Sequence, residues 1–309
     1  MGTISSSSPV LDDNGNPATR RIVLAYRRDT GELVGRGMTS DGVGDAHWAN
    51  VQLLLMTRGY NNSTSLIDYS PTRKTITIVG DVKLTTAKAF GENASAVFDG
   101  SNDYLNITDS SITPGTGDFT LEGFIRRTGT TDSSVNNDSI LWEMRTSGAT
   151  SEPLVYIDGN DSSNNLVYFA TSDRITGSPI LINTDYHIEL ARVSGVTRLF
   201  LNGVQQGSSY TDATNYISNQ IRIGGRYASI SSNFRSYNGY HGCFRYTKGV
   251  GRHSSNFTPP SYFVACDSTL GAGQYTIDTG SYNGECTVVI LDDFGTPVLN
   301  DLVLRTTPV

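Results

Sequence analysis

The sequence has no long hydrophobic run. Of its 309 residues, 37% are hydrophobic, and no stretch approaches the roughly 20 apolar residues that a membrane-spanning helix needs. The first ten residues, MGTISSSSPV, contain neither the basic nor the apolar segment of a secretory signal. We therefore expect a soluble protein that is made in the cytoplasm without a secretory signal and is not inserted into a membrane.

Cysteine is scarce. The chain has three cysteines, Cys243, Cys266 and Cys286, so they cannot all pair, and no two of them show the C-x-x-C spacing of a metal site. Cys266 and Cys286 are the two that lie close enough in sequence for a disulfide to be considered. The alternative is three small buried thiols, which is what a protein made in the cytoplasm favours.

Charge is also low, and basic charge is the scarcer kind. Charged residues make up 17% of the chain, with 23 Lys and Arg against 30 Asp and Glu, for a net charge of -7. The basic residues are scattered and form no stripe that could neutralise a row of phosphates. Nucleic acid is therefore not an expected partner.

The sequence patterns of common catalytic sites are missing. Glycosidases need two carboxylates that flank the scissile bond, but the E-x-D-x-x-E strand motif is absent, and Glu122 and Glu143 each stand alone on an expected strand. The four histidines are dispersed without H-E-x-x-H spacing, and neither G-x-S-x-G nor a phosphate-binding glycine loop is present. We expect a protein that is not an enzyme, with a glycan-processing enzyme as the remaining alternative.

Strand and turn signals are plentiful instead. The chain has 32 glycines and 16 tyrosines, and apolar and polar residues alternate along 119–123 and 187–190, which is typical of half-buried strands in a two-layer sandwich. Residues 186–206 contain the turns Ser194-Gly195 and Asn202-Gly203 between apolar runs, which predicts three meandering antiparallel strands. The polar insertions 128–139 and 158–165 are expected to be exposed loops. The fold class is therefore all-β.

The two ends of the chain contain short strands of their own. Residues 10–44 and 273–309 each hold a few strand patterns joined by tight turns, too few for either end to bury a core. We expect the two ends to pair with each other, with the central sandwich inserted where the chain leaves near Gly44 and returns near Cys266. The alternative is two small independent caps.

An ordered set of motifs carries a resemblance to a known family. The motifs are HWANVQLLLMTRGYNNSTSLIDYSP, SAVFDGSNDYLNI, TGDFTLEGFIRR, DYHIELARVSGVTRLFLNGVQQG, IRIGG and FRYTKGVGRHSSNFTPP. They resemble the laminin-G-like, concanavalin A-like jelly-roll domain of bacteriophage virion proteins. The resemblance implies a jelly-roll sandwich over residues 45–265 that binds glycans or other surfaces or serves as a structural module, sometimes with calcium.

The flanks resemble the two halves of a small carboxypeptidase-regulatory-like, Ig-like β-sandwich of phage structural proteins. The implied architecture is a jelly roll inserted into a small Ig-like β-sandwich that is formed by the two termini, residues 1–44 and 266–309. In one place the chain departs from the family: related domains often carry an acidic IDDLRI-like strand before TKGV, where this chain has HGCFRY. Any role of those acids cannot be carried over.

Two candidate sites follow. If the chain binds an ion, calcium is expected, because Asp99 and Asp103 in FDGSNDYL could supply loop carboxylates; the alternative is that both aspartates hold turns through their own backbone. A ligand contact is expected in a stretch rich in tyrosine and arginine, whose rings stack on sugars and whose guanidinium groups bind hydroxyls or carboxylates. The alternative is that this strand is half core and half rim. The residues of the second site are Arg226, Tyr227, Arg235, Tyr237 and Tyr240.

These observations together predict a phage virion protein. The expected function is adhesion to a host surface or glycan by a displayed lectin-like domain, as a tail fibre or decoration module that the split small domain anchors to the particle. A purely structural tail, collar or capsid component without a ligand is the alternative. The expected location is the virion, and the expected partners are other virion proteins, further copies of the same chain in a homo-oligomer, and a host-surface glycan.

Overall fold

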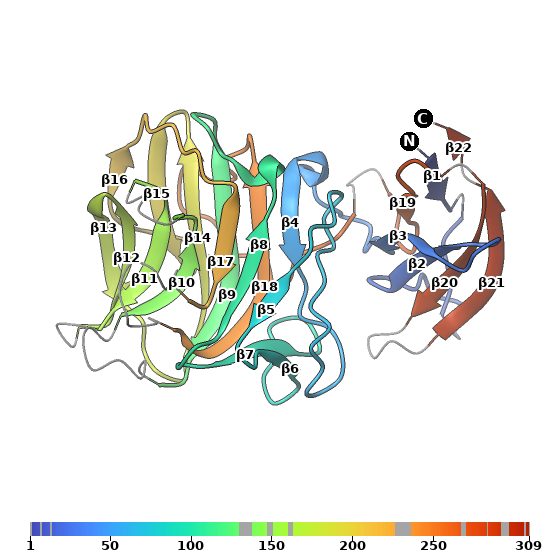
Figure 1. Ribbon diagram of the computed structural model, residues 1–309, viewed down its shortest axis with the longest axis horizontal. Coiled ribbons are helices and arrows are strands. Elements are labelled where there is room, and N and C mark those ends of the chain that lie inside the picture. Colours follow the sequence, from blue (N-terminus) through green and yellow to red (C-terminus); the bar gives the residue numbers. More distant parts are fainter. Residues whose placement is uncertain are drawn as a thin grey trace. The chain divides into compact units, whose positions relative to one another are not determined.

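The computed structural model describes residues 2–6, 8–12, 14–129, 138–146, 151–159, 163–225, 236–266, 270–282, 284–291, 297–305 and 307–308. Apart from two 3-10 turns, η1 (Trp48–Asn50) and η2 (Ser110–Ile112), its regular elements are strands (Figure 1). The predicted all-β class is confirmed. Within the described ranges, no helix is long and apolar enough to cross a membrane.

The chain divides into two compact units. The larger comprises Asn50–Asp68 and Thr72–Tyr262, and the smaller comprises Met1–Ala49, Tyr69–Pro71 and Phe263–Val309. The smaller unit therefore contains both ends of the chain, and the larger unit is inserted between them. The exact domain boundaries at residues 44 and 266 stay a prediction.

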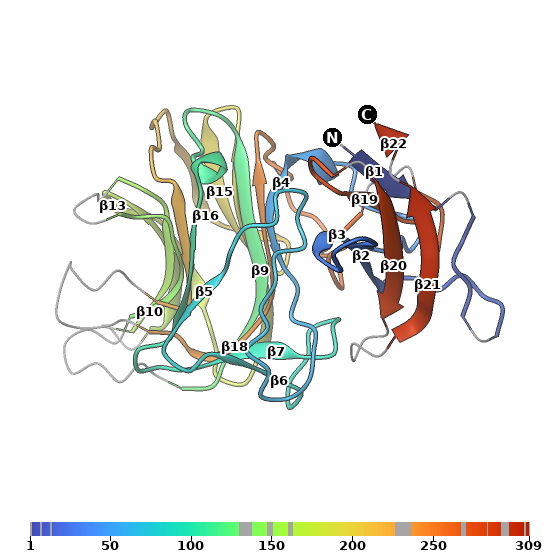
Figure 2. The same cartoon turned by 45° about the vertical axis from the view of Figure 1, so that its right-hand side comes forward.

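The larger unit is a sandwich of two antiparallel sheets, which Figure 2 shows as facing layers, with β10 and β13 in one and β9 and β18 in the other. The seven-stranded sheet has the order β13 (Ser172–Pro179), β12 (Asn165–Ala170), β11 (Leu154–Asp158), β10 (Ser139–Glu143), β17 (Gln220–Ile223), β8 (Tyr104–Thr108) and β5 (Thr77–Val79). The eight-stranded sheet has the order β16 (Val204–Thr211), β15 (Val196–Leu201), β14 (Asp185–Val193), β9 (Phe119–Arg127), β18 (Asn238–Lys248), β7 (Ser95–Asp99) and β6 (Lys83–Thr85), with β4 (Val51–Leu55) beside β18.

The long strand β18 pairs with β9 on one side and with two strands in succession on the other. Its first part pairs with β7 from Asn238 to His241, and its second part pairs with β4 from Phe244 to Thr247. An irregularity in its pairing with β9 lies between His241 and Phe244. A bulge of this kind bends a strand, so one strand can serve two neighbours in succession.

The core lies between the two sheets and follows the predicted alternation. Phe119, Leu121, Ile188 and Leu190 are buried in it. Trp142 is also in the core, where its indole N–H donates to Nε2 of His241 over 2.7 Å. Burial of these alternate side chains from both sheets confirms the predicted two-layer sandwich.

The outward side chains of β9 and β14 differ from the half-buried pattern that the sequence predicts. Thr120, Glu122 and Glu189 are all fully buried. Residues 250–257, here called the covering segment, lie over them: the Thr120 hydroxyl donates to the Val250 carbonyl and accepts from the Arg252 amide. Both faces of these strands are covered for this reason.

The predicted meander of three strands is confirmed. β14, β15 and β16 pair in succession as antiparallel neighbours. Ser194 and Gly195 have φ of 50° and 72°, and Asn202 and Gly203 have φ of 51° and 76°, the positive values that a tight two-residue hairpin turn requires at both positions. Residues 130–137 and 160–162 of the two predicted polar loops, 128–139 and 158–165, lie outside the described residues. The prediction is too wide at the ends, because Ser139, Asp158 and Asn165 belong to strands and Asp138 is buried.

The two termini together build the smaller unit. One sheet has the order β21 (Pro297–Arg305), β20 (Glu285–Leu291), β2 (Ile22–Arg27) and β3 (Leu33–Met38), and the other has the order β19 (Thr276–Asp278), β1 (Gly2–Ser5) and β22 (Thr307–Pro308). Both sheets therefore combine strands from the two ends of the chain, and these strands share one core. The prediction of paired ends is confirmed, and the alternative of two independent caps is wrong.

Cysteine pairing is settled by the same structure. Cys243, Cys266 and Cys286 are all buried, and none of the three forms a disulfide. Cys286 packs in the core of the smaller unit, and the carbonyl of Cys266 accepts the amide of Asp45 over 2.9 Å. The alternative of three buried thiols is the one that holds.

Candidate functional site

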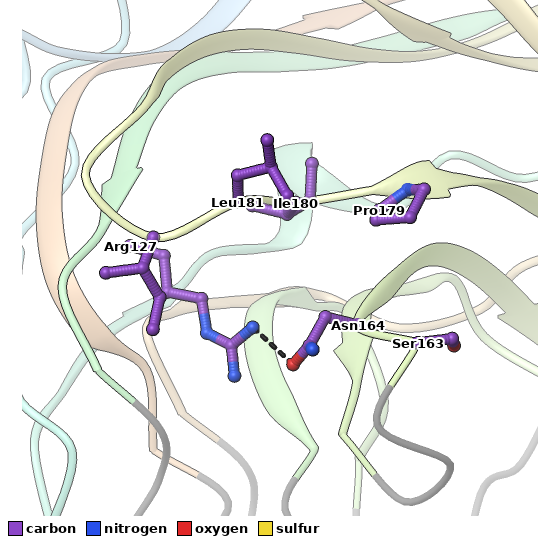
Figure 3. Close-up of a pocket in the computed structure, with 7 residues that line it drawn as sticks. Arg127, Ser163, Asn164, Pro179, Ile180 and Leu181 are labelled. Carbon is purple, nitrogen blue, oxygen red and sulfur yellow. Dashed lines mark hydrogen bonds between the residues drawn. The ribbon is translucent and has the colours of Figure 1, made fainter.

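A cavity of about 490 Å³ opens at one end of the larger unit (Figure 3). It lies where the last residue of β9, in one sheet, meets the ends of β12 and β13, in the other. The connection from β13 to β14 passes from one sheet to the other at this point. Its lining residues are Arg127, Ser163, Asn164, Pro179, Ile180, Leu181 and Ile182.

Backbone hydrogen bonds hold the walls of this cavity. The Ile180 amide donates to the Asn164 carbonyl over 2.9 Å, and the Asn183 amide donates to the Arg127 carbonyl over 2.7 Å. Asn164 and Asn183 have positive φ, of 56° and 59°, a conformation that asparagine tolerates better than most residues. The connection between the sheets is thus tied to both of them.

The guanidinium group of Arg127 stands against Asn164 in the cavity wall (Figure 3). Arg127 is 1% exposed. Its Nε donates to the Gly129 carbonyl over 2.9 Å, Nη1 donates to the side-chain oxygen of Asn164, and Nη2 has no partner. Both acceptors are neutral, and among the described residues no carboxylate pairs with this arginine. Burial lowers the pKa of Arg127, but an arginine starts so high that it stays charged.

The rim of the cavity is apolar. Leu181 and Ile182 are 60% and 48% exposed, whereas Ile180 between Pro179 and Leu181 points into the core. Large apolar side chains at the surface beside a cavity are a usual feature of binding sites. The cavity thus combines an apolar rim with one buried positive charge, and sequence patterns gave no signal for it.

Three aspartates form a second cluster. The carboxylates of Asp81, Asp99 and Asp103 offer ligand atoms within 4.8 Å of one another, with Asp81 and Asp99 exposed and Asp103 buried. The two oxygens of Asp103 accept the amides of Asp81 and Asp99 over 2.8 and 3.1 Å. Burial raises the pKa of Asp103 despite these two bonds. Asp103 therefore links the two turns, and Asp99 holds its own turn by accepting the Ser101 amide over 2.7 Å.

A set of three carboxylates suits calcium, which prefers hard oxygen ligands from loops. The structure brings Asp99 and Asp103 together, as their spacing suggests, and adds Asp81, which the sequence analysis missed. Asp81 arrives because β5 pairs with β8, with Val79 opposite Tyr104, and no sequence pattern reveals that register. Calcium binding at these residues stays a prediction.

The stretch rich in tyrosine and arginine is only partly described. Arg226, Tyr227 and Arg235 lie outside the described residues. Tyr237 is fully buried, its ring packs edge-on against Phe98 at 6.1 Å between centroids, and its hydroxyl donates to the Tyr240 carbonyl. A ring must be exposed to stack on a sugar, so Tyr237 is a core residue, which corrects its expected role as a ligand contact. Tyr240 is half-buried on β18.

Glu122 has a second carboxylate beside it. Glu189 on β14 lies directly opposite Glu122 on β9, and both are fully buried under the covering segment. Glu122 pairs with Arg245 at 2.8 Å and Arg252 at 3.3 Å, and Glu189 pairs with His253 at 2.8 Å. Glu122 is the one acid on β9, as expected, and the strand register brings Glu189 of β14 beside it.

These contacts fix the charge of the two acids. Burial opposes ionisation of Glu122, yet Arg245, His187 and Arg252 hold its pKa well below the usual range. Burial raises the pKa of Glu189, although His253 acts against it. Glu143 lies on the other sheet and pairs with Arg145 at 2.6 Å and Arg222 at 3.5 Å. Each of the three glutamates, Glu122, Glu189 and Glu143, therefore forms an ion pair with a basic side chain close to it.

Comparisons with known proteins concern the larger unit. A laminin G-type family model, described as the concanavalin A-like lectin/glucanases superfamily, matches residues 99–246, just under half of the chain. No curated protein sequence matches. The computed structure resembles the receptor-binding domain of botulinum neurotoxin D, with 12% identity, a TM-score of 0.49, and coverage of 68% of this chain and 50% of that one.

Two further solved structures show similar values. Domain 4 of an extracellular GH43 arabinanase from Geobacillus stearothermophilus, in complex with arabinotriose, has 15% identity and a TM-score of 0.45, covering 65% of this chain and 95% of that one. Trypanosoma rangeli sialidase has 11% identity and a TM-score of 0.45, covering 64% and 30%. The chain spans only about half the length of the neurotoxin domain. The family model and the two facing sheets together give the larger unit the concanavalin A-like jelly-roll fold.

Proposed function

We propose that this protein is a non-enzymatic component of a bacteriophage virion whose jelly-roll unit attaches to a glycan on the host surface. The observation that carries the binding role is the cavity at the end of the sandwich, where an apolar rim surrounds the polar side chains of Arg127, Asn164 and Ser163. Sugars present apolar C–H faces as well as hydroxyls, so this mixture suits them.

The arrangement of acids supports binding over hydrolysis. Glycosidases use two carboxylates across the scissile bond, and Glu122 and Glu189 are two carboxylates on adjacent strands. Both are fully buried and paired with bases. A substrate would have to displace the covering segment to reach them.

The virion assignment rests on the resemblance of the ordered motifs to phage domains. In this proposal the smaller unit, built from both termini, anchors the chain to other virion proteins or to further copies of itself. The larger unit, whose segments lie between the two termini in the sequence, is then the displayed part.

A glycan array probed with the purified chain tests the binding role. We expect binding to a restricted set of glycans, and we expect chromatography of the bound glycan after incubation to show it intact. Cleavage products would replace this proposal with an enzyme. Binding to no glycan, together with stable self-association, would replace it with a purely structural component.

The virion location has its own test. An antibody raised against the whole chain should label intact phage particles and reduce their adsorption to host cells. Labelling confined to the lysate, with none on purified particles, would contradict the proposal.

A further inference from the structure

We propose that the cavity beside Arg127 recognises a carboxylate group of an acidic saccharide. The inference rests on the proposed glycan binding and deepens it, because it names the charged group that the ligand carries. It starts from a buried cation in a chain whose net charge is -7.

Arg127 differs from the other buried arginines of the described ranges. Each of the others lies within ion-pair distance of a carboxylate. These pairs are Arg58 with Glu92, Arg145 and Arg222 with Glu143, Arg192 with Asp212, and Arg245 with Glu122. Arg127 has only a carbonyl and an amide oxygen as acceptors. A buried charge normally has an opposite partner. Among the described residues Arg127 has none, which leaves this place open to the carboxylate of a ligand.

The aspartate that starts the neighbouring strand β14 is already engaged. Asp185 lies opposite Arg126 in the strand pairing, and its carboxylate binds Arg126 at 2.6 Å and Lys88 at 2.5 Å. It compensates those two cations, and within the described part of the chain Arg127 has no ion pair of its own.

The donors that remain favour a planar anion. A guanidinium group has five N–H donors, of which Arg127 uses Nε and one from Nη1. The two N–H groups of Nη2 remain, together with the second of Nη1. Donors on adjacent nitrogens match the two oxygens of a carboxylate, which is the usual bidentate geometry of arginine.

The apolar rim accounts for the rest of the ligand. Leu181 and Ile182 are large and exposed, and they can pack against the C–H face of a sugar ring. Because Arg127 is 1% exposed, a carboxylate reaches it only when rim side chains move aside. Exposed side chains at the surface can do this at little cost, since they are not locked by packing.

The substitution Asn164→Asp tests the inference with almost no change of shape. It replaces the amide oxygen that accepts from Nη1 with a carboxylate, which gives Arg127 an internal counter-ion. The thermal stability of the variant should be equal to or above that of the wild type. Its affinity for a carboxylated ligand should fall about tenfold or more, the usual effect of losing a charged hydrogen bond.

Two further variants keep the test independent of folding. Asn219→Asp adds the same charge at an exposed position far from the cavity. Asn219 lies three residues after Tyr216, whose ring is 6.0 Å from that of Phe119, the first residue of β9. Arg127 lies eight residues further along β9, which is about 26 Å away. Asn219→Asp should leave affinity within about twofold, because charges beyond a Debye length are screened. Leu181→Glu places a negative charge on the rim itself and should weaken binding of the same ligand.

The probes are three oligosaccharides, compared by calorimetry in 150 mM salt. They are an oligogalacturonate, the same oligomer with its carboxylates methyl-esterified, and a sulfated galactan oligosaccharide. We expect the oligogalacturonate to bind, the esterified form to bind at least about tenfold more weakly, and Asn164→Asp to remove this preference.

Three results would overturn the inference. One is equal binding of the free and esterified oligomers, and another is unchanged affinity of Asn164→Asp. A third is tighter binding of the sulfated probe, which would assign the cavity to a sulfate. If neutral glycans on the array bind and Asn164→Asp does not affect them, the proposed glycan binding stands while this inference fails. If no saccharide binds at all, both fail.

Discussion

Two regions of the larger unit use the same kinds of residue in opposite ways. On the outer face of the eight-stranded sheet, Glu122 lies within 3.4 Å of three basic side chains, those of Arg245, Arg252 and His187. In the cavity at the end of the sandwich, the acceptors of Arg127 among the described residues are both neutral. In the first region, here called the complete region, the buried charge has partners of opposite charge. In the second, here called the incomplete region, no such partner lies among the described residues.

The difference separates a structural role from a binding role. Burying a charge costs several kcal/mol unless an opposite charge compensates it, so the complete region stabilises the fold by fastening the covering segment to the sheet. In the cavity the charge of Arg127 has no acidic partner among the described residues, and this is the charge that the proposed ligand would bind. The partners of a buried charge, and not its residue type, therefore indicate where a ligand binds.

The largest expected effect is in the complete region. Glu122→Gln leaves Arg245, Arg252 and His187 buried without their shared acid, and we expect a loss of about 3–5 kcal/mol in the free energy of unfolding. Urea denaturation followed by tryptophan fluorescence measures it, since Trp142 lies in the core.

The matched control is Asp185→Asn. Asp185 also binds two bases, Lys88 and Arg126, but its side chain is 44% exposed, so we expect a loss below about 1 kcal/mol. Similar losses for the two variants would mean that burial does not set the strength of these ion pairs.

The second prediction sets the two regions against each other directly. Arg245→Met removes a cation that Glu122 needs, with an expected loss of about 3 kcal/mol. Arg127→Met removes a cation without an acidic partner and should cost only about 1 kcal/mol, for two hydrogen bonds to neutral acceptors. The same denaturation experiment compares them. A larger loss for Arg127→Met would break the comparison, because it would show that the cavity charge is structural.

The third prediction uses pH. The folded pKa of Glu122 is depressed, so its contribution to stability is present above the unfolded value of about 4.3 and is lost as the pH falls below it. From pH 6 to pH 3 we expect the wild type to lose about 1–2 kcal/mol more than Glu122→Gln. Glu189 acts in the opposite direction, since burial raises its pKa. Parallel pH profiles of the two proteins would exclude Glu122 as a source of acid sensitivity.

The sequence predicted those features that depend on neighbours along the chain. The turns at Ser194-Gly195 and Asn202-Gly203 follow from local backbone preferences, and the inward side chains of β9 follow from alternation. The pairing of the two termini followed from counting strands, because neither end could bury a core alone.

The features that the sequence did not predict depend on contacts between residues of different strands. Glu189 lies opposite Glu122, and Asp81 lies near Asp103, only because of strand register. The burial of Tyr237 also could not be predicted, because Tyr237 directly precedes β18 and alternation gives no direction for a residue outside a strand. The cavity at Arg127 is harder still, because its signal is the absence of an acid near a buried base, and such a partner could come from any part of the chain.

The smallest expected effect concerns the aspartate cluster, which is intermediate between the two regions in how its charges are compensated. Asp103 is buried, and backbone amides donate to its carboxylate. Asp81 and Asp99 are exposed. If calcium binds there, a concentration about five times its dissociation constant should stabilise the fold by about 1 kcal/mol. For a unit of this size that corresponds to roughly 2–4 °C in Tm. Asp81→Asn should abolish the shift without lowering Tm in EDTA, because Asp81 contributes to the turn only through its backbone. A calcium shift that survives Asp81→Asn would place the ion elsewhere, and no shift in the wild type would leave the cluster as two turns that Asp103 links.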